Sequence, residues 1–211
     1  MGTHDFFARS RSKSNEKREL RETFLIVCEG ERTEPNYFLK FPIKKDVIEV
    51  DVVGEGRNTE SLVREAIKRK RIAETQGKPY VQIWVVFDRD SFPAGNFQKA
   101  IKLCDVNTIN YAVSNEAFEL WYLLHFNYYD SAMSRIQYGS KLSEQMGRKY
   151  EKNHVDIYET LKDKQELAIK RAKKLKKYQF DLRGHDDYCI SNPITTVYEL
   201  VEVLNRYTEE D

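Results

Sequence analysis

The stretch TFLIVCEG at residues 23–30 decides the fold, together with a second stretch of the same kind, WVVFDRD at residues 84–90. Each is an apolar run too short for a helix, and each ends in carboxylates. Ligands of an open α/β sheet bind beyond the carboxyl ends of its strands. If the two strands are neighbours, we expect Glu29, Asp88 and Asp90 to meet at one edge of the sheet.

These three carboxylates predict a metal site. Such groups repel each other unless a cation lies between them, and hard oxygen ligands favour Mg²⁺ or Mn²⁺. Asp88 and Asp90 are two residues apart, which places both on the same side of an extended segment. We interpret Glu29 as a further ligand or as the general acid or base of phosphodiester chemistry. The competing interpretation is that all three are solvated residues at strand ends.

Strands and helices alternate along the chain from Thr23 to Phe126. We expect strands at 23–28, 47–53, 80–87 and 108–113, the third of them central because it is the most apolar. Ser114 and Asn115 are expected to cap a strongly apolar helix that follows the fourth strand. This alternation predicts an α/β fold with a mainly parallel central sheet flanked by helices.

From about residue 127 the pattern becomes helical and more polar, which predicts a helical C-terminal extension. We expect residues 128–150 to be irregular, helices at 155–161 and 164–178, and a last helix opened by Asn192 and Pro193. Residues 1–22 form a basic arm in this interpretation, and residues 23–211 form a single domain.

Composition limits the class of protein. A chain of 211 residues with 40% hydrophobic content can bury one substantial core. Three scattered cysteines without a CxxC motif predict free thiols in a reducing cytoplasm, and four scattered histidines argue against a zinc set. No apolar run approaches the roughly 20 residues that span a bilayer, and the start lacks the apolar segment of a signal peptide. We therefore expect a soluble, cytoplasmic protein.

A glutamate after one strand and Asp-x-Asp after a later one resembles the acidic signature of the Toprim fold, the Mg²⁺ domain of topoisomerases, primases and OLD-type nucleases. The surrounding sequence motifs are similar to those of the RloB-like family over nearly the whole chain. Four motifs carry this resemblance: VCEGERTEPNYF at 27–38, FDRD at 87–90, SNxxFELWxLLHF at 114–126 and NPxTTV at 192–197.

The resemblance implies a role in bacterial anti-phage defence, with an AAA-type ATPase encoded nearby as partner. It is consistent with a Mg²⁺- or Mn²⁺-dependent nuclease that hydrolyses phosphodiester bonds of DNA or RNA. A topoisomerase is disfavoured because strand passage needs large gate domains. The alternative is a non-catalytic sensor or adaptor, in which the same acidic edge binds a metal or nucleotide and the protein regulates the ATPase.

Further acidic or polar residues are candidates for the same site. OLD-type nucleases carry additional acidic ligands after the Asp-x-Asp, and Glu116 or Glu119 could fill that place. Glu119 lies in the most apolar helical stretch, where an unpartnered carboxylate is costly. Asn115 could orient a ligand, and Glu34 is either a site residue or a partner of a helix dipole. Glu116 departs from the family pattern, in which we expect a proline after Ser-Asn.

Basic residues predict where nucleic acid would bind. Arg32, Arg57 and Arg89 border the predicted acidic edge and could meet phosphates. A run of eight Lys or Arg within 162–177 forms a basic helix, which is either a solvated face or a surface for the phosphate backbone. Its candidate binding residues are Lys170, Arg171, Lys174 and Lys177.

Overall fold

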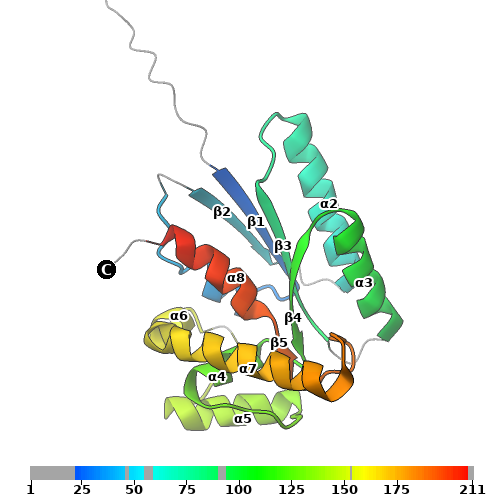
Figure 1. The fold of residues 1–211 in the computed structure, drawn as a ribbon. Coiled ribbons are helices and arrows are strands. Elements are labelled where there is room, and N and C mark those ends of the chain that lie inside the picture. Colours follow the sequence, from blue (N-terminus) through cyan, green and yellow to red (C-terminus); the bar gives the residue numbers. More distant parts are fainter. Residues whose placement is uncertain (1–21, 46–47, 55–58, 90–93, 153, 209–211) are drawn as a thin grey trace, which may run out of the picture.

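The computed structural model describes residues 22–45, 48–54, 59–89, 94–152 and 154–208. Within these residues five strands form one sheet in the order β2-β1-β3-β4-β5, in which only β5 runs antiparallel to its neighbour (Figure 1). The strands are β1 (Glu22–Cys28), β2 (Ile48–Gly54), β3 (Gln82–Asp88), β4 (Asn110–Asn115) and β5 (Ile194–Thr195). The predicted α/β fold with a mainly parallel sheet is confirmed, and β3 is its middle strand.

Helices cover both faces of this sheet (Figure 1). One face carries α2 (Thr59–Thr75) and α3 (Ala94–Val106). The other face is covered by the remaining elements, among which α5 and α7 both pack against α4. These helices are α1 (Thr33–Phe38), α4 (Glu119–Phe126), α5 (Arg135–Met146), α6 (Ile157–Leu161), α7 (Gln165–Arg183) and α8 (Val197–Leu204), with short 3₁₀ turns at 162–164 and 205–207.

The two apolar cores follow directly from the alternation of side chains along β1. Phe24 and Ile26 face the core under α4 and α7, whereas Leu25 and Val27 face the core under α2 and α3. All four are fully buried, as expected of a parallel strand covered on both faces. This double burial explains why the strand reads as a continuous apolar run.

Three local expectations are wrong. Ser114 and Asn115 do not cap a helix but end β4, and α4 begins only at Glu119. The segment 128–150 is not irregular throughout, because α5 forms there. Its start is fixed by Ser134, whose hydroxyl accepts the backbone N–H of Gln137 while the Gln137 side chain accepts that of Ser134. The last helix is preceded by the short strand β5, which pairs with the end of β4.

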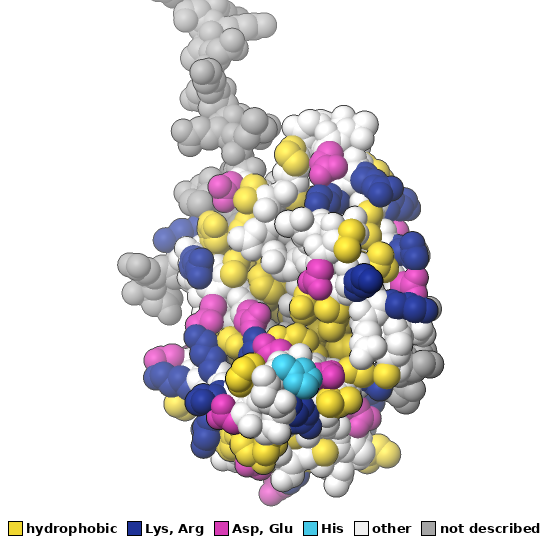
Figure 2. Space-filling model, turned by 45° about the vertical axis from the view of Figure 1, so that its right-hand side comes forward, with side chains coloured by type: hydrophobic (Ala, Val, Ile, Leu, Met, Phe, Trp, Pro, Cys, Tyr) yellow, Lys and Arg dark blue, Asp and Glu magenta, His cyan; other side chains and the backbone are white. Residues whose placement is uncertain are grey.

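Charges on the surface are mixed. On the face shown in Figure 2, Lys and Arg side chains in dark blue are interspersed with Asp and Glu side chains in magenta. The three cysteines are free and buried, as expected. None of the helices in the described part of the chain combines the length and the apolar character that crossing a bilayer requires.

Gly54 lets the end of β2 approach the loop that follows β1. A Cβ added there would lie 2.7 Å from the carbonyl oxygen of Gly30 and 2.8 Å from the Cα of Glu31. Both are backbone atoms, so Gly54→Ala should shift this loop and lower the free energy of unfolding by about 1–3 kcal/mol. Urea denaturation measures the effect.

The matched control is Gly95→Ala in α3, where a Cβ would meet nothing within 4 Å. This change should leave stability equal or raise it by up to about 1 kcal/mol, because alanine favours the helix. Equal unfolding midpoints for the two variants would contradict the close approach at Gly54.

Candidate acidic pocket at the edge of the sheet

The carboxyl ends of β1 and β3 open into a pocket of about 330 Å³. The chain leaves β1 toward β2 on one side and continues through β3 and β4 on the other, so the two strands flank the switch point of the sheet. Open α/β sheets bind ligands at this point. The pocket is lined by Glu29, Gly30, Glu31, Arg32, Thr33, Glu34, Asp88, Phe118, Glu119, Arg135 and Lys152.

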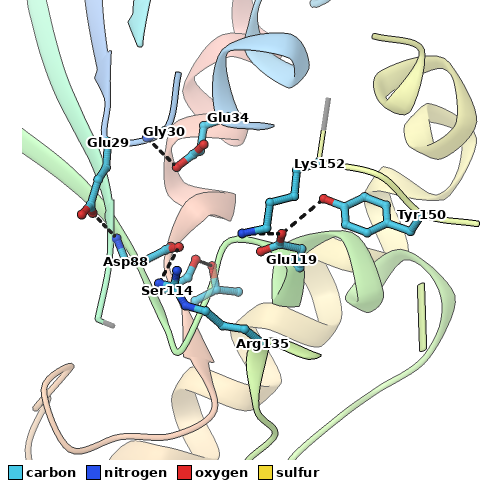
Figure 3. A network of polar contacts seen from close by, with 10 residues as sticks. Glu29, Gly30, Glu34, Asp88, Ser114, Glu119, Arg135, Tyr150 and Lys152 are labelled. Atoms are coloured by element: carbon cyan, nitrogen blue, oxygen red, sulfur yellow. Dashed lines mark hydrogen bonds and ion pairs between the residues drawn. The ribbon is translucent and has the colours of Figure 1, made fainter. Parts of the chain in front are cut away.

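Glu29 and Asp88 are brought together as the sequence predicts, because their strands are paired neighbours. Glu29 directly follows β1, and its Oε2 accepts the backbone N–H of Asp88 at 3.0 Å. This bond ties the end of one strand to the end of the next (Figure 3). Asp90 lies outside the described residues, so its expected position beside Asp88 stays a prediction.

Two buried glutamates complete the acidic lining. Glu34, in the first turn of α1, is 4% exposed, and its Oε1 accepts the backbone N–H of Gly30 at 3.2 Å. Glu119, the first residue of α4, is 5% exposed. The hydroxyl of Tyr150 donates to its Oε1 at 3.4 Å, and the Nζ of Lys152 lies 3.7 Å from the same oxygen (Figure 3).

The carboxylates repel one another across the pocket. Burial raises the pKa of Asp88 well above its usual value, and the charges of Glu34, Glu119 and Glu29 raise it further, while Arg135 opposes them. Burial also raises the pKa of Glu34, with a further contribution from Glu119. Asp88 and Glu34 are thus harder to ionise than isolated carboxyl groups, as in other sites where acids share one space.

Arg135 and Lys152 bring positive charge into the pocket, and neither was singled out from the sequence. The Nη2 of Arg135 lies 3.7 Å from the Oδ2 of Asp88. Arg135 is the first residue of α5, directly after the Ser134 cap. The Ser-x-x-Gln spacing at 134–137 is a capping-box signal that could have located this helix and its first residue.

Asn115 and Glu116 are placed away from this lining. The Asn115 side-chain amide donates to the carbonyl oxygens of Tyr188 at 3.3 Å and Cys189 at 3.4 Å, which ties the end of β4 to the loop before β5. Glu116 is half-buried, and neither residue is among the described ones that line the pocket. The structure therefore gives Asn115 a structural contact, and a role for either residue in ligand binding stays a prediction.

The predicted loop arginines differ in position. Arg32 lines the pocket. The Nε of Arg89 donates to the Sγ of Cys189 at 3.3 Å, beside the loop that precedes β5. Arg57 lies outside the described residues.

The basic side chains of α7 have interactions within the protein. Lys170 pairs with Glu166 at 2.7 Å, Lys177 pairs with Asp181 at 3.0 Å, and Lys174 lies over the ring of Tyr128, 4.3 Å from its centroid. Arg171 donates from Nη1 to the carbonyl oxygens of Leu124 at 2.7 Å and His125 at 2.9 Å. It thereby satisfies the last carbonyls of α4. Nucleic-acid binding by these four residues stays a prediction.

His125 is buried at the end of α4 and contacts the backbone rather than the pocket. Its Nδ1 lies 2.9 Å from the carbonyl oxygen of Trp121, which requires the proton on Nδ1. Burial lowers the pKa of His125 to about 3. The unfolded chain takes up a proton below about pH 6.5 and the folded protein does not until about pH 3, so stability is lost as pH falls between these values.

His125→Phe should remove this part of the pH dependence. Urea denaturation from pH 7 to pH 4 should show that the parent loses up to about 1.4 kcal/mol per pH unit more than the variant below pH 6.5. The comparison cancels the carboxylates that titrate in both proteins. Parallel pH profiles of the parent and the variant would show that His125 takes up its proton at the same pH in the folded and the unfolded state.

The fold and the pocket together define an α/β protein with an acidic pocket at the switch point of its sheet. A sequence profile described as RloB-like protein matches residues 24–204, and the chain belongs to this family. No curated protein and no solved structure matches the chain.

Proposed function

We propose that this protein is a Mg²⁺- or Mn²⁺-dependent hydrolase of phosphodiester bonds in nucleic acid. The observation that carries the proposal is the convergence of Glu29, Glu34, Asp88 and Glu119 on one pocket. They come from the ends of two strands and the first turns of two helices, so the fold itself brings them together.

The lining suits a divalent cation by its charge and by its donor atoms. Five carboxylates and three basic side chains line the described part of the pocket, which leaves a formal charge of −2. Carboxylate oxygens are the ligands that Mg²⁺ prefers. Burial raises the pKa of Asp88 and repulsion by the other carboxylates raises it further, and a bound cation would neutralise that repulsion. Among the described residues, however, no three His, Cys, Asp or Glu side chains form a ready-made metal-binding group.

We assign roles within this pocket from position and burial. Asp88 and Asp90 would hold the cation, with Glu29 beside them as a ligand or as the group that accepts a proton from the attacking water. Glu34 and Glu119, both buried, would maintain the negative potential that favours the cation. The cation itself supplies polarisation of the phosphate and activation of water.

We infer the biological setting from family membership. We propose that the protein acts in anti-phage defence in the cytoplasm and that an AAA-type ATPase is its partner. Hydrolysis could then depend on the partner.

A cleavage assay tests the proposal. Purified protein is incubated with plasmid, linear duplex, single-stranded DNA or tRNA, in Mg²⁺, Mn²⁺ or chelator, with and without the neighbouring ATPase. We expect metal-dependent breakage of at least one substrate. Metal binding without cleavage in every arm would instead favour a non-catalytic sensor or adaptor, and absence of both would overturn the proposal.

A further inference from the structure

Two basic side chains reach the acidic pocket from the segment that follows α4. Arg135, at the start of α5, faces Asp88, and Lys152 faces Glu119 (Figure 3). Asp88 is the last residue of β3 and its side chain is only 15% exposed, and Glu119 is the first residue of α4 and its side chain is only 7% exposed. The basic side chains are 40% and 64% exposed. The basic side chains therefore lie on the solvent side of the carboxylates.

Both ion pairs are loose. Each has a nitrogen–oxygen distance of 3.7 Å, whereas a charge-assisted hydrogen bond between such groups is about 2.7–2.9 Å long. Tight pairs occur elsewhere in the same protein, for example Lys170 with Glu166 at 2.7 Å. In the pocket, the guanidinium of Arg135 and the ammonium of Lys152 therefore lie beside carboxylates without the short hydrogen bond of a tight pair.

Helix stability does not explain a positive charge at the start of α5. The amino end of a helix carries a partial positive charge, so a cation there is unfavourable. The first turn of α5 contains no acidic residue that would compensate. Arg135 and the helix end together make the solvent side of this acidic pocket locally attractive to anions.

We propose that Arg135 and Lys152 bind a phosphate group of the nucleic-acid substrate. Without a divalent cation they partly neutralise Asp88 and Glu119, and when a cation takes over that role they contact the phosphate. A guanidinium matches a phosphate with two parallel donors, and an ammonium adds a point charge. The inference rests on the proposed function of the same pocket, and it assigns phosphate recognition to the pocket rather than to α7.

The test measures how salt weakens binding. Fluorescence anisotropy of labelled phosphorothioate single strands and duplexes is recorded in Mg²⁺ over a series of KCl concentrations. For Arg135→Gln/Lys152→Gln we expect weaker binding. The slope of log affinity against log salt should become shallower by about 0.7 for single strands and about 0.9 for duplexes, which corresponds to one lost phosphate contact.

The matched control removes one arginine and one lysine from the same segment but outside the pocket lining. Arg148 pairs with Asp156 at 3.1 Å and Lys149 pairs with Glu151 at 3.2 Å, both on the surface. Arg148→Gln/Lys149→Gln should keep the slope of the parent. A third variant, Lys170→Gln/Lys174→Gln/Lys177→Gln, reports on α7.

The inference is overturned if the pocket variant keeps the slope of the parent, or if the slope of the control variant becomes shallower by the same amount. It is also overturned if only the α7 variant has a shallower slope, or if the parent binds neither probe. Calorimetry with Mg²⁺ separates this failure from failure of the proposed function. A parent that binds no Mg²⁺ counts against the proposed function, whereas Mg²⁺ binding with an unchanged slope counts against phosphate recognition by Arg135 and Lys152.

Discussion

Asp88→Asn should abolish binding of Mg²⁺ and reduce nucleic-acid cleavage by about a thousand-fold or more. A catalytic metal contributes several kcal/mol to the transition state, and each 1.36 kcal/mol is worth a factor of ten in rate. Burial and the charges of three other carboxylates raise the pKa of Asp88, so Asp88 lies at the centre of the negative field. The amide also keeps the size of the side chain and the backbone N–H that donates to Glu29.

The metal-free Asp88→Asn variant should be at least as stable as the parent, because the change removes repulsion between buried like charges. Asp181→Asn is the matched control, since Asp181 is an exposed residue of α7 that pairs with Lys177. It should keep metal binding and cleavage. Calorimetry and cleavage rates measure both variants, and Mg²⁺ affinity that is unchanged in Asp88→Asn would disprove the metal site.

The sequence predicts the centre of this pocket well because strand burial leaves a strong pattern. Residues 24–28 are fully buried on both faces of the sheet, which forces a continuous apolar run and makes the following Glu29 conspicuous. The same reasoning applies to β3 and Asp88. Because β1 and β3 are paired side by side, the carboxylates that follow their two apolar runs lie at the same end of the sheet.

The basic part of the pocket could not be predicted in this way. Arg135 meets Asp88, and Lys152 meets Glu119, through contacts across 47 and 33 residues of chain that leave no periodic pattern. Only the start of α5 had a local signal, the capping box at Ser134. Spacing within one helix likewise did not reveal that Arg171 binds the end of α4, because its acceptors belong to another helix.

Burial, not sequence spacing, also distinguishes two glutamates that the sequence suggests for the same site. Glu34 and Glu116 are both polar residues near the start of helical segments, yet only Glu34 is buried in the lining. A cost in stability must accompany that burial, because desolvation raises the pKa of Glu34. A buried carboxylate at Glu34 has a physical reason if the pocket binds a cation, because its negative potential attracts that cation.

Glu34→Gln should therefore move stability and metal affinity in opposite directions. The amide oxygen can still accept the backbone N–H of Gly30, so the loop after β1 keeps its hydrogen bond. Loss of the buried charge should raise the free energy of unfolding of the metal-free protein by roughly 1 kcal/mol, since it removes both desolvation and repulsion with Glu119 and Asp88.

In the same variant Mg²⁺ should bind about 10–100-fold more weakly, the usual effect of changing a group that supports metal ligands. Glu166→Gln, at an exposed site on α7 paired with Lys170, makes the same chemical change without the pocket and should alter neither quantity by much. Urea denaturation without metal and calorimetry with Mg²⁺ measure the two effects. If Glu34→Gln lowered stability and left the affinity unchanged, Glu34 would serve the fold of the loop rather than the cation, and the negative potential would have to come from Glu29, Asp88 and Glu119 alone.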